Sequence, residues 1–589
     1  MKQLFVFCLL LIANSVHAIP AKKIWRTITQ SDGSQLKVLL VGDEHLHYFL
    51  TEDNVPLVQR NRNFYYAQKQ DGRLVSSSML AHAAKWRTST EKKQMSTVDE
   101  IETIRDTIPT VRRMLRKLPP ARKEAYQGDK KGLIILVNFS DNKFSMKDPK
   151  ATFSDIANKP GYSDNNAKGS VHDYFYDQSN GKFNLTFDVV GPIALKKTIA
   201  YYGSDTDQGN DARVSEMIVE ACQAVKDMVD YNDYDWDEDG VVDQVFILYA
   251  GYGQATSLYS ETVWPHESNI SSKNLVLDGV RINTYACSNE LYEHRSGLGI
   301  GRKRDVLMGI GVICHEFSHC LGLPDFYDTG GSNYGTGSWD ILARGSYNGP
   351  LGIGWVPAGY TSYEKNFAGW LDYTELSNEE KNVTNMKPLG EGGEAYAIYN
   401  PWNRNEYFLL ENRGNSKWDT HVPQSGLLVL HVDYDEDLWR NNMVNNTAYR
   451  QINNHQRLTV VPADNNTGNE DRDTYPLRTH DSLTAASTPA LALYNTAADG
   501  SRLLGCKVLG IAKDVSGYIS FSYKPDPRFA NTTAIDNLSA DRPAGKIVAI
   551  YDLRGIKLSQ ISTETLRPGI YVVKMADGSR RKLRIGPNR

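Results

Sequence analysis

Short, almost continuously apolar runs alternate with amphipathic stretches through the middle of the chain. Residues 133–139 and 245–249 are such runs, and their length and composition are typical of buried strands. The segments 170–176 and 213–229 have the apolar spacing of helices. Strands that alternate with helices in this way predict an α/β domain.

The pattern changes on both sides of this region. Residues 45–66 predict short strands around a polar break, and beyond about Tyr373 short strands such as 407–411 and 427–432 are separated by turns. We therefore expect an α+β or α/β multidomain protein whose α/β domain is followed by one or more β-rich domains. The length of 589 residues fits about three to five folding units.

The N-terminus has the pattern of a secretory signal peptide. Lys2 precedes the apolar run 4–13, and Val16-His17-Ala18 supplies the small-residue exit, so we predict cleavage after Ala18. A membrane anchor would need about 20 apolar residues, roughly twice the length of this run. No later segment is long enough to span a bilayer, and we expect an exported, extracellular or cell-surface bacterial protein.

The segment 112–131 is rich in Lys and Arg and is interrupted by Pro119-Pro120. These features predict an exposed, cleavable linker at the end of a propeptide. The alternative is a solvated basic loop with no such role, because charge runs often have none.

Composition and charge exclude some classes of protein. Hydrophobic residues make up 40% of the chain, with 33 Tyr and 10 Trp, so buried cores are expected in place of general disorder. The 66 Lys and Arg are interspersed with 70 Asp and Glu and leave a net charge of −4, which argues against a nucleic-acid-coating protein. The cysteines beyond the signal peptide are odd in number and irregular in spacing, and therefore do not form a disulfide scaffold: Cys222, Cys287, Cys314, Cys320 and Cys506.

The candidate chemistry is concentrated in residues 306–325. His315, Glu316 and His319 form the pattern H-E-x-x-H, which on a helix places both imidazoles on one face, one turn apart. Two such imidazoles can bind one zinc ion, and Glu316, turned by about 100°, suits a residue beside the metal-bound water. The helix is expected to be buried, because the remaining positions are largely apolar: Val306, Leu307, Ile310, Ile313, Phe317 and Leu321.

The residues after the motif predict a reversal of the chain. Gly322 permits a left-handed turn, Pro324 cannot continue the helix, and Asp325 follows at the spacing of a third zinc ligand. The alternatives are a pair of hydrogen-bonded core histidines with a salt-bridged glutamate and, for Asp325, an ordinary turn residue.

The run from His315 to Asp325, followed by Gly337-Ser338-Trp339-Asp340, resembles the immune inhibitor A type of secreted bacterial metallopeptidase. The similarity extends over roughly residues 132–373 and more loosely to about 523. The resemblance implies a zincin fold of the metzincin-like branch, zinc ligands His315, His319 and Asp325, Glu316 as general base, and endopeptidase action on proteins or peptides.

Two further positions bear on this resemblance. Where the family usually has a methionine below the metal this chain has Leu342, whose similar volume should alter stability and not abolish function. Tyr347 lies shortly downstream and is a candidate to stabilise an oxyanion, although most tyrosines are structural.

A second candidate metal site is an acidic loop before the strand at 245. Alternate carboxylates with a glycine at the sharp bend suit Ca²⁺, with the expected ligands Asp235, Asp237, Asp239 and Asp243, and Val241 through its carbonyl. The twelfth position of an EF-hand would be Glu, whereas Phe246 stands there, so the match is partial. The alternative is an acidic turn that binds nothing.

The C-terminal segment has a different character. Residues 547–555 and 569–574 predict strands, and with the basic residues 580–582 they resemble the C-terminal sorting domain of type IX secretion. That resemblance implies type IX secretion machinery as a partner; a plain terminal β-sandwich fragment is the alternative.

These observations predict five segments: a signal peptide at 1–18, a propeptide at 19–131, a zinc metallopeptidase catalytic domain at 132–375, a β-rich domain at 376–525, and a linker with a sorting-like β domain at 526–589. The propeptide contains no cysteine, so its zymogen latency must come from a carboxylate, a histidine or steric cover. The expected function is that of a calcium-stabilised zinc endopeptidase in which Glu316 activates the zinc-bound water. A surface binding protein on a protease scaffold and a zinc aminopeptidase or amidase are the alternatives.

Overall fold

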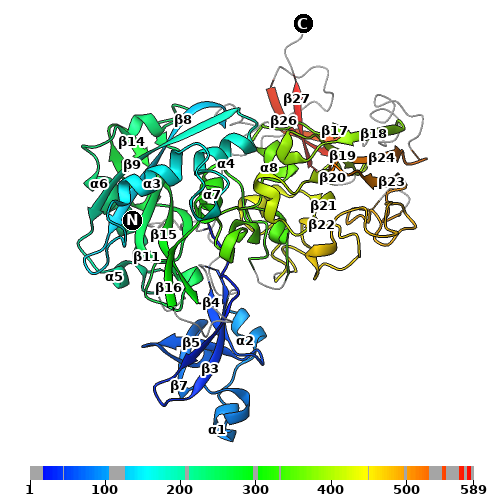
Figure 1. Ribbon diagram of the computed structural model, residues 1–589. Helices are drawn as coiled ribbons and strands as arrows, with labels where there is room; N and C mark the ends of the chain where they lie inside the picture. The colour runs from blue at the N-terminus through cyan, green and yellow to red at the C-terminus, as the bar shows by residue number, and fades with distance from the viewer. Residues whose placement is uncertain are drawn as a thin grey trace, which may run out of the picture. The chain divides into compact units, whose positions relative to one another are not determined.

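A computed structural model describes residues 17–43, 46–104, 126–205, 211–295, 303–329, 333–448, 450–496, 500–528, 547–551, 569–575 and 580–585. The predicted signal peptide, apart from residues 17–18, and most of the predicted basic linker lie outside these residues. The chain divides into two compact units, 1–524 and 525–589, which are treated separately (Figure 1).

A seven-stranded mixed sheet forms the centre of the α/β region, in the order β1-β12-β15-β11-β8-β9, with β16 also paired to β15. The strands β9, β8, β11 and β15 are parallel to one another, whereas β12 and β16 are antiparallel to β15 and β1 is antiparallel to β12. Their bounds are β1 His17–Ala18, β8 Gly128–Asn138, β9 Phe183–Ala194, β11 Val245–Tyr252, β12 His266–Asn269, β15 Thr284–Arg295 and β16 Lys303–Leu307.

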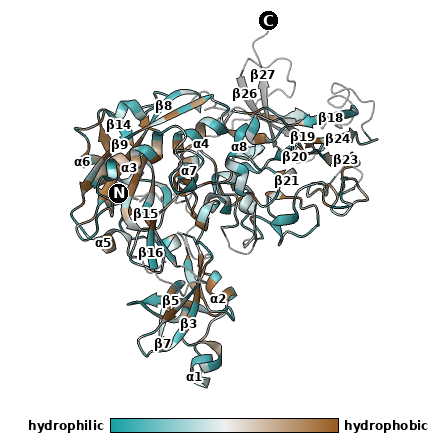
Figure 2. Cartoon of the chain, viewed as in Figure 1, coloured by the Kyte–Doolittle hydropathy of each residue, from teal (hydrophilic) through white to brown (hydrophobic). Residues whose placement is uncertain are grey.

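Helices cover both faces of this sheet, which explains why residues 245–250 of β11 and 133–137 of β8 are buried apolar runs. On β8, Ile134 and Leu136 contribute to one core with the helices α3, α4 and α7, while Leu133, Ile135 and Val137 contribute to a second core with α6. The hydrophobic colouring of β8 and β11 can be followed in Figure 2. The helices are α3 Pro149–Asn158, α4 Val171–Gln178, α5 Ile199–Gly203, α6 Val214–Ala224, α7 Gly311–Cys320 and α8 Ser362–Phe367.

The mixed α/β architecture expected from the alternating pattern is confirmed, with differences in detail. The helix α6 ends at Ala224, five residues before the end of the predicted segment 213–229. Lys130 and Lys131, placed in the basic linker by sequence, belong to β8, where they pair with β9. A small sheet of β10 Val241–Val242, β13 Val276–Leu277 and β14 Val280–Ile282 lies next in sequence to the acidic loop.

The predicted propeptide contains a six-stranded antiparallel sheet in which each strand pairs with the next. Strands β4 to β6 correspond to the strands expected within residues 45–66. The elements are β2 Trp25–Thr29, β3 Gln35–Gly42, β4 His47–Leu50, β5 Pro56–Arg60, β6 Asn63–Gln70, β7 Arg73–Leu80, α1 Ser89–Lys92 and α2 Val98–Glu102.

The region after about residue 373 is β-rich, as the alternating pattern predicts. A five-stranded sheet has the order β17-β19-β20-β21-β22, and a three-stranded sheet has the order β18-β24-β23. Both contribute to one hydrophobic core. The elements are β17 Thr374–Glu375, β18 Lys381–Met386, β19 Ala395–Tyr399, β20 Glu406–Arg413, β21 Gly426–Asp433, α9 Glu436–Arg440, β22 Leu458–Val460, β23 Lys507–Lys513 and β24 Ile519–Lys524.

The smaller unit contains three antiparallel strands, β25 Ile547–Tyr551, β26 Gly569–Met575 and β27 Arg580–Ile585. β25 and β26 lie within or over the two strands expected near the C-terminus, whereas β27, which contains the basic residues 580–582, is a strand that the pattern did not predict. Within the described residues of the whole chain, no helix has the length and apolar character needed to cross a membrane.

Candidate metal centre

The H-E-x-x-H motif lies on α7, a helix whose residues Gly311–His319 are all buried. Val306 and Leu307, assigned to this helix from the sequence, lie instead at the end of β16. The helix starts later because Val306 and Leu307 pair with Tyr292 and Leu291 of β15. The backbone at the first helical residue is tightly packed: a Cβ on Gly311 would lie 1.8 Å from the Ser346 carbonyl oxygen. Only glycine fits at that position.

The side chains of His315, His319 and Asp325 converge on one point. The two Nε2 atoms are 3.1 Å apart, and the Asp325 Oδ1 atom lies 3.3 Å from His315 Nε2 and 3.2 Å from His319 Nε2. A tetrahedral ion with bonds of about 2.0 Å holds its ligand atoms roughly 3.3 Å apart. The three atoms therefore have the mutual spacing of zinc ligands.

The hydrogen bonds around this cluster fix the histidine tautomers. His315 Nδ1 lies 2.7 Å from the Ile341 carbonyl oxygen and His319 Nδ1 lies 2.8 Å from that of Leu323, so each Nδ1–H donates outward. Both Nε2 atoms then present lone pairs to each other and to Asp325 Oδ1, which is buried and accepts no hydrogen bond from a described residue. Three buried acceptor atoms this close together fit a bound cation.

The chain reversal that delivers Asp325 takes place at Gly322. This glycine has φ of +99°, a left-handed conformation that a residue with a Cβ rarely adopts. Its N–H donates to the His319 carbonyl, and the Leu323 N–H donates to that of Ser318. The αL glycine therefore ends the helix and turns Asp325 back toward the two histidines.

Asn442, from the loop after α9, holds Asp325 in place. The Asp325 N–H donates to Asn442 Oδ1, and Asn442 Nδ2 donates to Asp325 Oδ2, each over 2.6 Å. Sequence reasoning missed this residue, since it stands 117 positions away. The only signal was the density of asparagines at 441–446.

Glu316 lies beside this cluster and is fully buried. His315, Glu316 and His319 each offer a ligand atom within 4.8 Å of the others. Burial, followed by the nearby Asp325 carboxylate, raises the pKa of Glu316 well above its ordinary range. A divalent cation held by the three ligands would act in the opposite direction and favour the ionised form.

The N-terminal segment passes directly in front of Glu316. The strand β1 pairs with the edge strand β12, with Ala18 opposite His266. The Ile19 N–H donates to Glu316 Oε1 over 3.1 Å, and the indole N–H of Trp264 donates to the Ile19 carbonyl over 3.1 Å.

Tyr347, predicted as an oxyanion stabiliser, contacts the same segment. Its hydroxyl donates to the Pro20 carbonyl over 3.0 Å, one residue beyond Ile19. The tyrosine hydroxyl is therefore bound by the same N-terminal segment that contacts Glu316.

Leu342 occupies the place at which the resemblance expects a methionine. It is fully buried, its N–H donates to Asp340 Oδ1, and the neighbouring Ile341 supplies the carbonyl that orients His315. The segment therefore positions a ligand through its backbone, whichever apolar side chain fills the space.

The acidic loop places three of its predicted calcium ligands together. Asp235, Asp237 and Asp239 each offer an oxygen within 4.8 Å of the others. Asp243 instead accepts a hydrogen bond from the Trp236 N–H over 2.6 Å, and the Val241 N–H donates to Asp239 Oδ1. Part of the predicted ligand set is thus brought together, and Asp243 is turned to the backbone.

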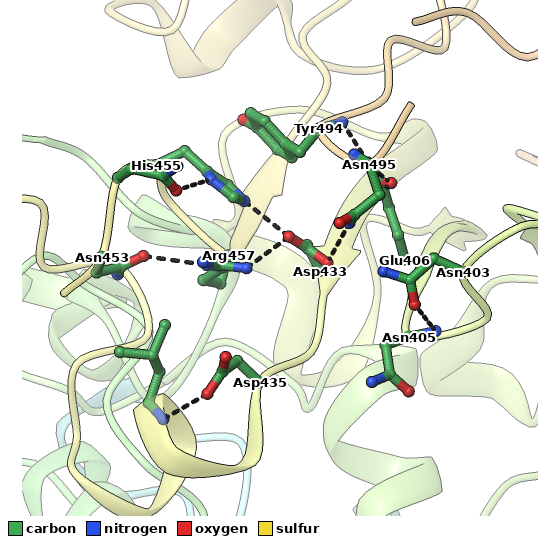
Figure 3. Close-up of polar contacts among 12 residues, drawn as sticks. Asn403, Asn405, Glu406, Asp433, Asp435, Asn453, His455, Arg457, Tyr494 and Asn495 are labelled. Carbon is green, nitrogen blue, oxygen red and sulfur yellow. Dashed lines mark hydrogen bonds and ion pairs between the residues drawn. The ribbon is translucent and has the colours of Figure 1, made fainter. Parts of the chain in front are cut away.

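A polar network in the β-rich region anchors the loop that carries Asn442. Asp433, at the end of β21, accepts from Arg457 over 2.6 Å, lies 2.8 Å from His455 Nε2 and accepts from Asn495 over 2.9 Å (Figure 3). The backbone N–H of Arg457 donates to the side-chain oxygen of Asn445. The side-chain Nδ2 group of Asn445 donates in turn to the Phe326 carbonyl. The network therefore links β21 to the segment just after Asp325.

Comparison with known proteins points to one family. Residues 121–371 match the family described as immune inhibitor A peptidase M6, catalytic domain. The chain is 24% identical over 315 residues to immune inhibitor A of Bacillus thuringiensis subsp. alesti, covering 45% of this chain and 44% of that protein. It is 28% identical over 251 residues to the pre-pro-metalloprotease PrtV of Vibrio cholerae serotype O1, covering 37% of this chain and 26% of that protein.

The aligned region thus spans less than half the length of each of these relatives. The family match, at residues 121–371, takes in α7, the turn at Gly322 and Asp325. Residues 121–371 are therefore similar to the catalytic domain of the M6 peptidases, and this match together with the relatives' names supports a metalloendopeptidase.

Proposed function

We propose that this chain is a secreted zinc endopeptidase that hydrolyses internal peptide bonds of proteins. The single observation that carries the proposal is the convergence of His315, His319 and Asp325 at 3.1 to 3.3 Å beside the buried carboxyl group of Glu316. The M6 match over residues 121–371 supports the same activity.

His315, His319 and Asp325 would hold the zinc ion, which when bound makes a water molecule more acidic and polarises the peptide carbonyl. Glu316 takes a proton from the attacking water and delivers it to the leaving amine nitrogen. Hydrogen bonds to the Asn442 amide and to the carbonyls of Ile341 and Leu323 fix the orientation of the three side chains. Tyr347 lies where it can donate to a substrate carbonyl.

The protein is made as a zymogen in this proposal, blocked by steric cover. Residues Ile19–Lys22 cover the site. The Ile19 N–H donates a hydrogen bond to Glu316, and the Pro20 carbonyl accepts one from the Tyr347 hydroxyl. The Lys22 N–H donates to the Ala255 carbonyl. Cleavage of the signal peptide after Ala18 would leave the α-amino group of Ile19 at the atom that now donates to Glu316. The general base would then be paired until the propeptide is removed.

Calcium has a stabilising role in the proposal. The oxygens of Asp235, Asp237 and Asp239 gather in a loop between the η6 turn at Tyr231–Tyr234 and β10. Carboxylates this close repel one another, and a divalent cation relieves that repulsion. The C-terminal three-stranded unit is proposed to act in export through type IX machinery, and deletion of residues 526–589 should then retain the protein within the cell.

The endopeptidase proposal is tested by mapping the products formed from unfolded casein. The activated wild-type protein is expected to cut internal bonds, and a zinc chelator should stop the reaction until zinc is restored. Release of single N-terminal residues would indicate an aminopeptidase instead. Failure to cut any bond with zinc bound would favour a binding protein.

A further inference from the structure

The N-terminal segment beside Glu316 carries a lysine whose ammonium group contacts two aromatic rings. Lys22 Nζ lies 4.3 Å from the ring centroid of Tyr292 and 5.6 Å from that of Tyr347, and it donates to the Leu351 carbonyl over 3.3 Å. Tyr292 and Tyr347 are only 5% and 8% exposed, so their rings are held by packing. We call Tyr292, Tyr347, Leu351 and Gly352 the lysine cradle.

Gly352 borders the ammonium group. Its φ is +62°, and an added Cβ would lie 3.6 Å from Lys22 Nζ, an ordinary contact distance. The backbone of residues 351–352 therefore forms one side of the cradle. All four residues belong to the region that matches the M6 catalytic domain, so the cradle stays in place when the propeptide leaves.

Arg26 of the propeptide acts against the cation in the cradle. Burial, and then repulsion from Arg26, lower the pKa of Lys22 to about 7. Arg26 is held by Glu293, with which it pairs over 3.4 Å. Arg26 leaves with the propeptide, so an ammonium group that enters the free cradle no longer meets this repulsion.

The pairing of the N-terminal segment with β12 shows how many residues separate Lys22 from the residue that contacts Glu316. Ala18 pairs with the edge strand β12 opposite His266, and the next N–H, that of Ile19, donates to Glu316. The peptide group between Ala18 and Ile19 therefore lies beside the proposed general base, and we take it as the counterpart of a scissile bond. Counted from that bond toward the C-terminus, Lys22 is the fourth residue.

We propose that the lysine cradle is a substrate subsite, which binds a lysine side chain at the fourth position after the scissile bond. The inference rests on the proposed endopeptidase function and adds a substrate preference to it. An ammonium group over two tyrosine rings gains binding that corresponds to about threefold to thirtyfold in affinity. A single carbonyl acceptor matches the compact ammonium of lysine better than the planar fork of arginine.

The preference is measured with synthetic peptides on the secreted full chain, activated by limited proteolysis. An internal site cut in casein supplies the sequence, and its fourth following residue is replaced by Lys, norleucine or Glu. We expect kcat/KM to be about threefold to thirtyfold higher for Lys than for norleucine, and lowest for Glu. Equal values for Lys and norleucine would overturn the subsite and leave the endopeptidase proposal intact.

Two substitutions then assign the preference to the cradle. Tyr292→Leu removes an aromatic face and should reduce the Lys-to-norleucine ratio to near one, whereas Tyr292→Phe keeps the face and should keep the ratio. A ratio unchanged in Tyr292→Leu would also overturn the proposal. The ratio of kcat/KM for the Lys peptide to that for the norleucine peptide is measured on one preparation of each variant. Unfolded protein lowers both values by the same factor and therefore does not alter the ratio.

A binding measurement separates the two proposals fully. The peptide Ile-Pro-Ala-Lys, the sequence of residues 19–22, should bind the activated protein several-fold more tightly than its norleucine analogue, whether or not catalysis occurs. If no internal bond is ever cut, the proposed function fails, and this comparison still decides the subsite.

Discussion

Asn442 and Asp325 bind each other through two hydrogen bonds of 2.6 Å, although 117 positions separate them in the chain. One bond fixes the backbone of Asp325 and the other fixes the carboxylate oxygen that points away from the histidines. A residue of the β-rich region thus orients a proposed zinc ligand of the α/β region. The zinc site is therefore expected to depend on a part of the chain that the M6 match does not include.

Replacement of Asn442 by glycine should weaken zinc binding by about tenfold to a hundredfold, because loss of a second-shell partner usually has an effect of this size. Glycine is chosen because Asn442 has φ of +51°, which glycine adopts without strain. Zinc affinity is measured by competition with a chromogenic chelator. Asn385→Gly, with φ of +57° at the substituted position, is the matched control and should bind zinc like wild type. Equal zinc affinity in the two variants would show that Asn442 does not position Asp325.

His47 of the propeptide should make latency depend on pH. Its Nε2 lies 3.2 Å from Asp205 Oδ2, its Nδ1 lies 3.1 Å from the Asp43 carbonyl, and its ring stacks on Trp264. Burial acts to lower the pKa of His47, but the Asp205 carboxylate, with help from Asp43, outweighs it and the pKa is raised above 6.5. His47 of the docked propeptide therefore stays protonated at a pH at which His47 of the released propeptide loses its proton.

Because the pKa is raised in the docked state, the stabilisation is complete below about pH 6.5 and is lost as the pH rises through the raised value. Activation by limited proteolysis should accelerate as the pH rises from about 6 to 8, by at most about tenfold per pH unit for one proton. The rate is followed by gel analysis of propeptide release, corrected for the pH dependence of the added protease. His47→Gln and Asp205→Asn should each flatten the profile, and an unchanged profile in both variants would exclude this pair as the cause.

Methionine should replace Leu342 with little effect. The site is fully buried and acts on His315 through the Ile341 carbonyl, so a swap of similar volume should change the free energy of unfolding by less than about 1.5 kcal/mol. Leu342→Ala, which leaves a cavity, should cost about 2 to 5 kcal/mol. Denaturant unfolding and the zinc competition assay measure both. A large change in zinc affinity for Leu342→Met would mean that the side chain itself tunes the metal.

Calcium should raise the melting temperature of the protein at constant zinc concentration. Calcium at a hundred times its dissociation constant adds about 2.7 kcal/mol, which corresponds to roughly 5 to 10 °C for a domain of this size. Asp237→Asn removes a charge from the cluster and should abolish most of the shift. Asp233→Asn changes a neighbouring carboxylate that pairs with Lys131, and in this variant calcium should still raise the melting temperature as in wild type. A shift equally large in both variants would place the calcium elsewhere.

The part of the candidate centre that follows local rules could be predicted from the sequence. The spacing of His315 and His319 depends only on helix geometry, and Gly322 marks the turn through a backbone conformation that few other residues adopt. The alternating strands and helices likewise predicted the mixed α/β architecture. The start of α7 could not be predicted, because the pairing of Val306 and Leu307 with β15 keeps them out of the helix and no local pattern specifies that pairing.

Contacts between segments that are distant in the chain could not be predicted either, because no local pattern specifies them. Nothing near Asn442 specifies that its amide meets Asp325, and nothing near Ile19 specifies that its N–H meets Glu316. Lys130 and Lys131 appeared to belong to a basic loop, yet pairing with β9 places them in a sheet. In each case the deciding partner lies far along the chain, and only the folded structure reveals it.

The most direct test measures zinc content and casein cleavage together on the wild type and on Glu316→Gln. The substitution keeps the size of the side chain and leaves His315, His319 and Asp325 in place. The account predicts one tightly bound zinc per chain in both proteins, with cleavage by the activated wild type and a loss of at least about a hundredfold in the variant. Purified wild type that cleaves casein without zinc, or a Glu316→Gln protein as active as wild type, would contradict it.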